Sequence, residues 1–188
     1  MPRTEGRAGR WGPVLVAVLA AGLGATLSAA RFIRVAPIVR DGQIFVSFEM
    51  ADAFTDDLRA AIQSGLTTTF VYDVGLRRAT TFWVDRTIAS SRVTASVRFD
   101  NLTRRYQVSR TQDGRVESSQ VVDDETLVRR LMTEFERLPV FNTTPLEPNV
   151  EYYMRVRAQT RPRGNAFVLP WDWDLEAASA IAKFTFIP

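Results

Sequence analysis

An alternation of apolar and polar residues with a period of two runs through most of the chain after residue 31, and it constrains the fold more than any other feature. Successive side chains of a β-strand point to opposite faces, so this pattern is typical of strands with one buried face. The alternating runs predict eight or so strands, around residues 32–39, 44–50, 70–76, 93–99, 106–108, 116 and its neighbours, 152–158 and 184–186.

Short strands with alternating faces predict a mainly β fold, an antiparallel two-layer β-sandwich with two inserted helices. The phrase LEPNVEYYM places Leu146, Pro148 and Tyr152 just before an alternating strand. This spacing resembles the tyrosine corner of immunoglobulin-like and fibronectin-III-like sandwiches, where a tyrosine hydroxyl bonds to the backbone a few residues upstream. We therefore expect the hydroxyl of Tyr152 to bond within or near residues 146–150. The alternative is an ordinary buried tyrosine.

The first predicted helix lies between Thr55 and Gly65. Thr55 is a suitable N-cap, and two aspartates follow it, where negative charge stabilises the positive end of the helix dipole. Gly65 is the expected structural residue at the other end, because glycine adopts the left-handed conformation that ends many helices. The threonines at 67–69 then favour a strand.

The second predicted helix runs from about Asp124 to Leu138, with Asp123 as its cap and Pro139 as its stop. Four apolar residues recur at helical spacing and predict a buried stripe with Val128 beside it, namely Leu127, Leu131, Phe135 and Leu138.

Composition limits both the number of domains and the available chemistry. The chain has 188 residues, 46% of them apolar and 24% charged, which indicates one globular domain over residues 31–188. It contains no cysteine and no histidine, which excludes disulfides, Cys/His zinc sites and histidine-based acid–base catalysis. We predict no catalytic, cofactor-binding or metal-binding residues. The net charge of +3 falls mostly within residues 1–30, so nucleic acid is not an expected partner.

Residues 1–30 have the layout of a targeting segment. Three arginines precede an uncharged run from Trp11 to Ala30, which ends in small residues. This pattern predicts either a secretory signal peptide or an uncleaved N-terminal membrane anchor, with membrane contact through residues 11–30. Both interpretations place the rest of the chain on the far side of a membrane, which in a bacterium is the periplasm or the outer face of the inner membrane.

Two phrases carry a family resemblance. Ser64-Gly65-Leu66 leads into a threonine-rich strand, and Leu102-Thr103-Arg104-Arg105-Tyr106 precedes another; a late Trp-Asp-Leu follows. The chain thereby resembles the DUF4390 family of bacterial exported proteins, which has no established biochemical function. The resemblance implies a protein of the cell envelope, with a membrane sensor histidine kinase as a possible partner.

The segment FVLPWDWDLE, residues 167–176, is the one cluster that mixes tryptophans with carboxylates. Exposed tryptophans with polar neighbours are typical of binding anchors. The predicted partner contact consists of Phe167, Leu169, Trp171 and Trp173. The alternatives are packing of these residues in the core, a calcium site and a glycosidase-like carboxylate pair.

Taken together, the sequence predicts a non-enzymatic binding, sensory or accessory module of the bacterial cell envelope, with a protein partner in or near the membrane. The alternative is an envelope enzyme or carrier that uses carboxylates on an unknown substrate.

Overall fold

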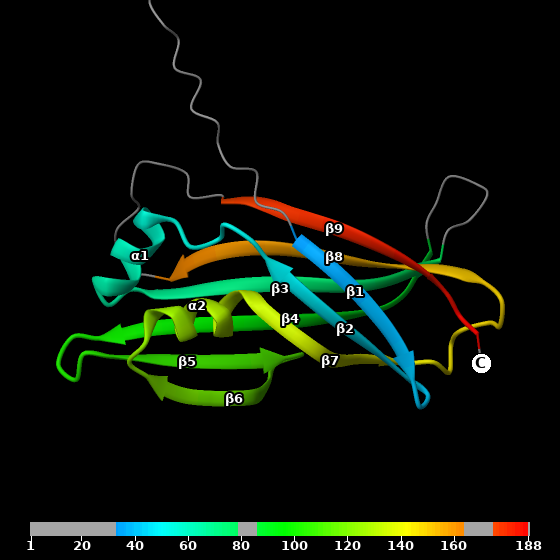
Figure 1. Ribbon diagram of the computed structural model, residues 1–188, viewed down its shortest axis with the longest axis horizontal. Helices are drawn as coiled ribbons and strands as arrows, with labels where there is room; N and C mark the ends of the chain where they lie inside the picture. Colours follow the sequence, from blue (N-terminus) through cyan, green and yellow to red (C-terminus); the bar gives the residue numbers. More distant parts are fainter. Residues whose placement is uncertain (1–32, 79–85, 164–174, 188) are drawn as a thin grey trace, which may run out of the picture.

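Two antiparallel sheets and two helices make up the part of the chain that the computed structural model describes, residues 33–78, 86–163 and 175–187. The first sheet has the order β1-β2-β7 and the second has the order β6-β5-β4-β3-β8-β9 (Figure 1). The elements are β1 (Ile33–Arg40), β2 (Gln43–Met50), α1 (Asp56–Gln63), β3 (Thr67–Arg78), β4 (Arg86–Asp100), β5 (Arg105–Gln112), β6 (Arg115–Val122), α2 (Glu125–Thr133), β7 (Glu134–Asn142), β8 (Glu151–Arg163) and β9 (Leu175–Thr185). The mainly β fold predicted from the alternation is confirmed.

The inner faces of the two sheets meet in one apolar core. Phe48 of β2 contacts Tyr72 of β3 with ring centroids 5.0 Å apart, and Phe135 of β7 stacks on Phe48 at 4.6 Å. All three side chains are at most 3% exposed. Each such side chain contributes roughly 1.5–3 kcal/mol through burial, which holds the layers together.

The strand order matches most of that of a variable-type immunoglobulin sandwich. Such sandwiches place strands A, B, E and D in one sheet and G, F, C, C′ and C″ in the other. In chain order, β1-β2-β7 match A-B-E and β9-β8-β3-β4-β5 match G-F-C-C′-C″, but no described strand takes the place of D, and β6 instead extends the edge of the six-stranded sheet. The immunoglobulin-like assignment is an interpretation based on this order and on the tyrosine corner.

Two tight hairpins have the glycine that their geometry needs. Asp113 and Gly114 join β5 to β6 with φ of 48° and 82°. Asp41 and Gly42 join β1 to β2 in the same way, with φ of 51° and 73°. Both central residues lie in the left-handed region, which matches the twist of the flanking strands.

Helix α1 begins and ends as predicted. The Thr55 hydroxyl accepts a hydrogen bond from the Leu58 N–H at 3.3 Å. At the other end, Gly65 has φ of 87° and its N–H donates to the Ile62 carbonyl, while the Leu66 N–H donates to the Ala61 carbonyl. This pair of bonds is a Schellman motif, which satisfies carbonyls that the helix leaves without partners.

Helix α2 is shorter than predicted, and its predicted cap and buried stripe are wrong. Asp124, not Asp123, is the N-cap, and the helix ends at Thr133. Leu127 is 37% exposed, and the helix buries Val128, which the sequence placed beside the stripe, together with Met132 and Thr133.

The residues from Glu134 onward form a strand that the alternation did not predict, β7, which pairs with β2. Pairing with β2 gives these backbone groups a ladder of hydrogen bonds, and this tertiary gain exceeds the local preference for helix. Pro139 is tolerated in β7 because the strand lies at the edge of its sheet.

Tyr152 lies near the start of β8 and is 1% exposed. Its hydroxyl accepts a hydrogen bond from the backbone N–H of Glu147 at 2.8 Å. A bond to backbone five residues upstream is the geometry of a tyrosine corner, and it fixes the turn that carries the chain from one sheet to the other.

Replacing Tyr152 by phenylalanine is expected to lower the free energy of unfolding by about 1 kcal/mol, the net value of one such bond. Chemical denaturation measures this loss, and hydrogen exchange of the Glu147 amide should accelerate, since that N–H loses its acceptor. An unchanged denaturation midpoint with unchanged exchange at Glu147 would contradict a role for this bond.

Candidate functional site

The predicted partner contact lies outside the described residues; it consists of Phe167, Leu169, Trp171 and Trp173. The predicted targeting segment, residues 1–30, also lies outside them. That hypothesis therefore stays a prediction. Among the residues that the structure describes, none of the helices has the length and apolar character needed to cross a membrane.

The strongest candidate site is a hollow of about 160 Å³ on the outer face of the six-stranded sheet. Gly75 of β3 lies at its centre. This glycine lies opposite Ser90 of β4 and Arg155 of β8. Because glycine has no side chain, the sheet surface is open where its two neighbouring strands carry long or polar residues. The hollow thus lies on the rigid centre of the sheet rather than on a loop.

Hydrogen-bond donors surround this hollow. Arg155 lies directly opposite Gly75 on β8, and Arg157 lies two residues farther along that strand. Arg77 is the next residue of β3 on the same face, and its Nε lies 3.9 Å from the position that a Cβ on Gly75 would take. The hydroxyls of Thr87 and Ser90 line the β4 side. Three guanidinium groups and two hydroxyls make the hollow strongly basic, and an oxyanion is the ligand type that suits such donors.

The one carboxylate at the hollow, that of Asp73, is already paired. The Arg92 Nε donates to it at 2.8 Å across the β3–β4 ladder. The hydrogen bond and the negative charge of Asp73 raise the pKa of Arg92. Asp73 lies between Arg92 on β4 and Arg157 on β8. It offsets one of the four positive charges of Arg77, Arg92, Arg155 and Arg157, so an excess of three positive charges remains around the hollow.

This hollow was not predicted from the sequence. A signal was present, because a glycine inside an alternating strand marks a bulge or a close approach. Which arginines flank Gly75 depends on the register of β3 with β8, a pairing of residues 80 positions apart that the alternation alone does not specify.

A second hollow, of about 280 Å³, lies on the outer face of the three-stranded sheet. Glu49, Glu134 and Glu136 line it together with Arg34. Glu49 and Glu136 are exposed and hydrated, whereas a general acid needs a desolvated carboxyl. No group of acidic residues in the described ranges is arranged to hold a metal ion.

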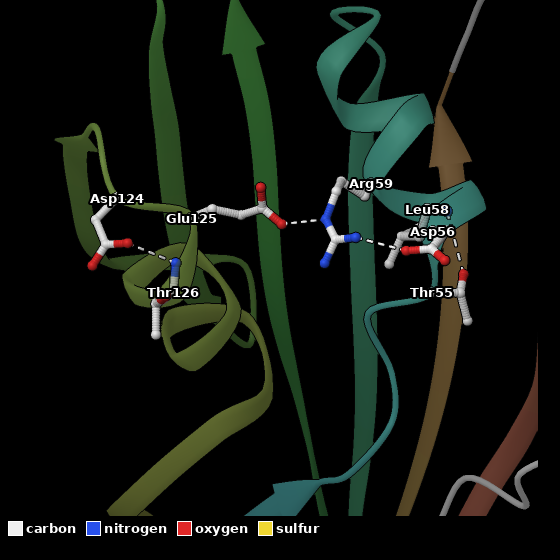
Figure 2. A network of polar contacts seen from close by, with 7 residues as sticks. All are labelled: Thr55, Asp56, Leu58, Arg59, Asp124, Glu125 and Thr126. Atoms are coloured by element: carbon white, nitrogen blue, oxygen red, sulfur yellow. Dashed lines mark hydrogen bonds and ion pairs between the residues drawn. The ribbon is translucent and has the colours of Figure 1, made fainter.

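An ion-pair network joins the two helices at one end of the sandwich (Figure 2). Arg59 of α1 donates to Asp56 at 2.6 Å and to Glu125 in the first turn of α2. The hydrogen bond that Arg59 donates to the Glu125 carboxylate is the main cause that raises the pKa of Arg59. The network lies at the surface, so we assign it to positioning of the helices.

Arg110 of β5 forms a half-buried contact with the end of α2. Its Nε donates to the Leu131 carbonyl at 2.7 Å, and its Nη2 donates to the carbonyls of Glu134 at 2.7 Å and Arg130 at 3.3 Å. The guanidinium also lies 4.3 Å from the centroid of the Phe135 ring. Burial lowers the pKa of Arg110. Its donors serve backbone carbonyls, so this buried charge has a structural role.

Tyr72 completes the same contact from β3. Its hydroxyl donates to the Met132 carbonyl at 2.7 Å, and burial raises the pKa of this phenol. Tyr72 and Arg110 thus cap the C-terminal end of α2, because they donate hydrogen bonds to carbonyls of its last turn that have no partner within the helix.

Comparison with known proteins gives one match. The family described as Domain of unknown function (DUF4390) matches residues 28–180. Neither a curated protein nor a solved structure matches the chain.

Proposed function

The chain belongs to the DUF4390 family, and we propose that it is a non-enzymatic binding module of the cell envelope that recognises an anionic group on its partner. The observation that carries the proposal is the hollow at Gly75, where Arg77, Arg155 and Arg157 surround a gap in the outer face of the six-stranded sheet.

The chemistry of this hollow favours binding over catalysis. An arginine side chain stays protonated in proteins, so it donates hydrogen bonds and does not act as a general base. The hydroxyls of Thr87 and Ser90 would need a base to become nucleophiles. The nearby carboxylate of Asp73 is held by Arg92. The groups present are therefore suited to hold an anion in place.

The proposed location follows from the targeting segment. Residues 1–30 direct export, and the domain works in the periplasm or on the outer face of the inner membrane. The partner is a protein in or near that membrane, and the family resemblance makes a sensor histidine kinase the first candidate.

The alternative is an envelope enzyme or carrier that works through carboxylates. The hollow lined by Glu49, Glu134 and Glu136 is the place where such chemistry would be sought. The exposure of Glu49 and Glu136 argues against this alternative, because a carboxyl that acts in acid–base catalysis is usually shielded from water.

Site-specific photo-crosslinking in cells tests the binding proposal. A photoreactive residue at Thr87, on the rim of the hollow, is expected to capture a discrete membrane protein. The triple change Arg77→Gln, Arg155→Gln and Arg157→Gln should reduce this product about tenfold, a loss of about 1.4 kcal/mol or more of binding free energy. Mass spectrometry identifies the captured protein.

A matched control removes the same charge elsewhere. Arg98→Gln, Arg105→Gln and Arg115→Gln change three exposed arginines away from the hollow and should leave the product intact. Equal loss with both triple variants would show a general charge effect, and equal yield with both would contradict recognition through the hollow.

A further inference from the structure

We propose that the hollow at Gly75 binds a phosphate group, presented as a phosphate ester or as the free ion. This inference deepens the proposed function, on which it rests for the choice of face, by naming the chemical class that the anion belongs to.

Arg155 supplies an observation that is independent of the charge count. Its Nε is inaccessible to solvent and has no hydrogen-bond partner among the described residues. A buried donor without an acceptor is costly, and such groups in native proteins call for an explanation. Arg155 lines the hollow beside Gly75. Its Nε is closed off from the hollow itself, so binding requires the guanidinium to rotate until this donor meets an oxygen atom held there.

The number of donors selects phosphate over carboxylate. A carboxylate offers two oxygens and one charge, which a single guanidinium can satisfy in a bidentate pair. Arg77, Arg155 and Arg157 provide three guanidinium groups, and Thr87 and Ser90 add two hydroxyls. A phosphate monoester offers three terminal oxygens and a charge of about −1.5 to −2, which matches this set more completely.

The size of the hollow limits what is recognised to one group. Its volume of about 160 Å³ is below the roughly 300–1,000 Å³ of pockets that enclose whole small molecules. The remainder of the ligand therefore extends away from the sheet. A lipid headgroup and a small soluble phosphate ester both satisfy this condition.

Gly75→Val separates a binding role from a folding role. A Cβ at this position would meet only the Arg77 Nε at 3.9 Å and the Arg155 carbonyl at 4.0 Å, both ordinary contacts. Valine also favours strands, so the variant should fold. Its branched side chain would occupy the space in which the phosphate binds.

The test follows the Nε–Hε resonance of Arg155 by NMR in the full-length chain in a non-ionic detergent, with Arg155→Gln to assign it. Inorganic phosphate or glycerol phosphate at constant ionic strength is expected to shift this resonance saturably, and acetate is expected to bind at least about tenfold more weakly. Gly75→Val should abolish the shift, and Arg98→Gln should retain it.

Vesicles distinguish the two sources of phosphate. A lipid headgroup is supported if the protein co-floats more with vesicles that contain phosphatidylglycerol than with phosphatidylcholine alone, and if Gly75→Val removes this increase. A soluble ligand is supported if only the soluble phosphate esters saturate the site. The proposal is overturned if none of these probes shifts Arg155, if acetate binds as tightly as phosphate, or if Gly75→Val binds like wild type. Because no protein partner takes part, the result is independent of the crosslinking experiment.

Discussion

Replacing Arg110 by methionine is expected to lower the free energy of unfolding by roughly 3–5 kcal/mol, which would make Arg110 one of the most important polar residues of the fold. The substitution keeps a long apolar stem but removes the bonds to the carbonyls of Leu131 and Glu134. Leaving a buried acceptor without a partner costs about 1–3 kcal/mol each. Loss of the cation–π contact with Phe135 adds about 0.5–2 kcal/mol.

Arg105→Met provides the control for this prediction. Arg105 lies on the same strand, is exposed and begins β5, so its replacement should change stability by no more than about 0.5 kcal/mol. Denaturant titration of both variants measures the difference. Equal small losses would mean that water replaces the guanidinium at the end of α2.

Alternation was sufficient to predict most of the strands because it directly reports burial on one face. The inner residues of β3 are buried in the pattern that the sequence showed, with Phe70, Tyr72, Val74 and Leu76 each at most 1% exposed. Local chemistry also predicted both ends of α1, since the hydrogen bonds of Thr55 and the conformation of Gly65 depend on neighbouring residues alone.

The end of α2 could not be predicted in the same way. Nothing in the sequence from Glu134 to Leu138 breaks a helix, and its apolar spacing fits one. The change from helix to strand at Thr133 depends on two distant side chains, those of Tyr72 and Arg110, which donate hydrogen bonds to carbonyls of the last helical turn. It also depends on β2, which offers β7 a free edge. These partners come together only in the folded chain.

The candidate site was difficult to predict for a related reason. Arg77 and Arg155 are two of many arginines in the sequence, and Gly75 is one of ten glycines. Their significance comes from cross-strand register, which places the glycine of β3 beside the arginine of β8. Register is fixed by the buried face of each strand, so the outer face inherits an arrangement that its own residues do not determine.

Phe135→Ala is expected to lower the free energy of unfolding by about 3–5 kcal/mol, as for other deletions of a packed aromatic side chain. Phe135 is 3% exposed, stacks on Phe48 at 4.6 Å and contacts the edge of the Tyr72 ring at 5.1 Å. Its removal would leave a cavity where the two sheets and the end of α2 meet. Thermal or chemical denaturation measures the loss.

Leu127→Ala is the informative comparison, because the helical interpretation and the structure disagree about it. A continuous helix to residue 138 would bury Leu127 and Phe135 on one stripe, so both changes would cost several kcal/mol. In the structure Leu127 is 37% exposed, and its replacement should cost no more than about 1 kcal/mol. Comparable losses at the two positions would contradict strand β7. The double variant Phe135→Ala and Arg110→Met should lose less free energy of unfolding than the sum of the two single changes, because Arg110 and Phe135 are in contact.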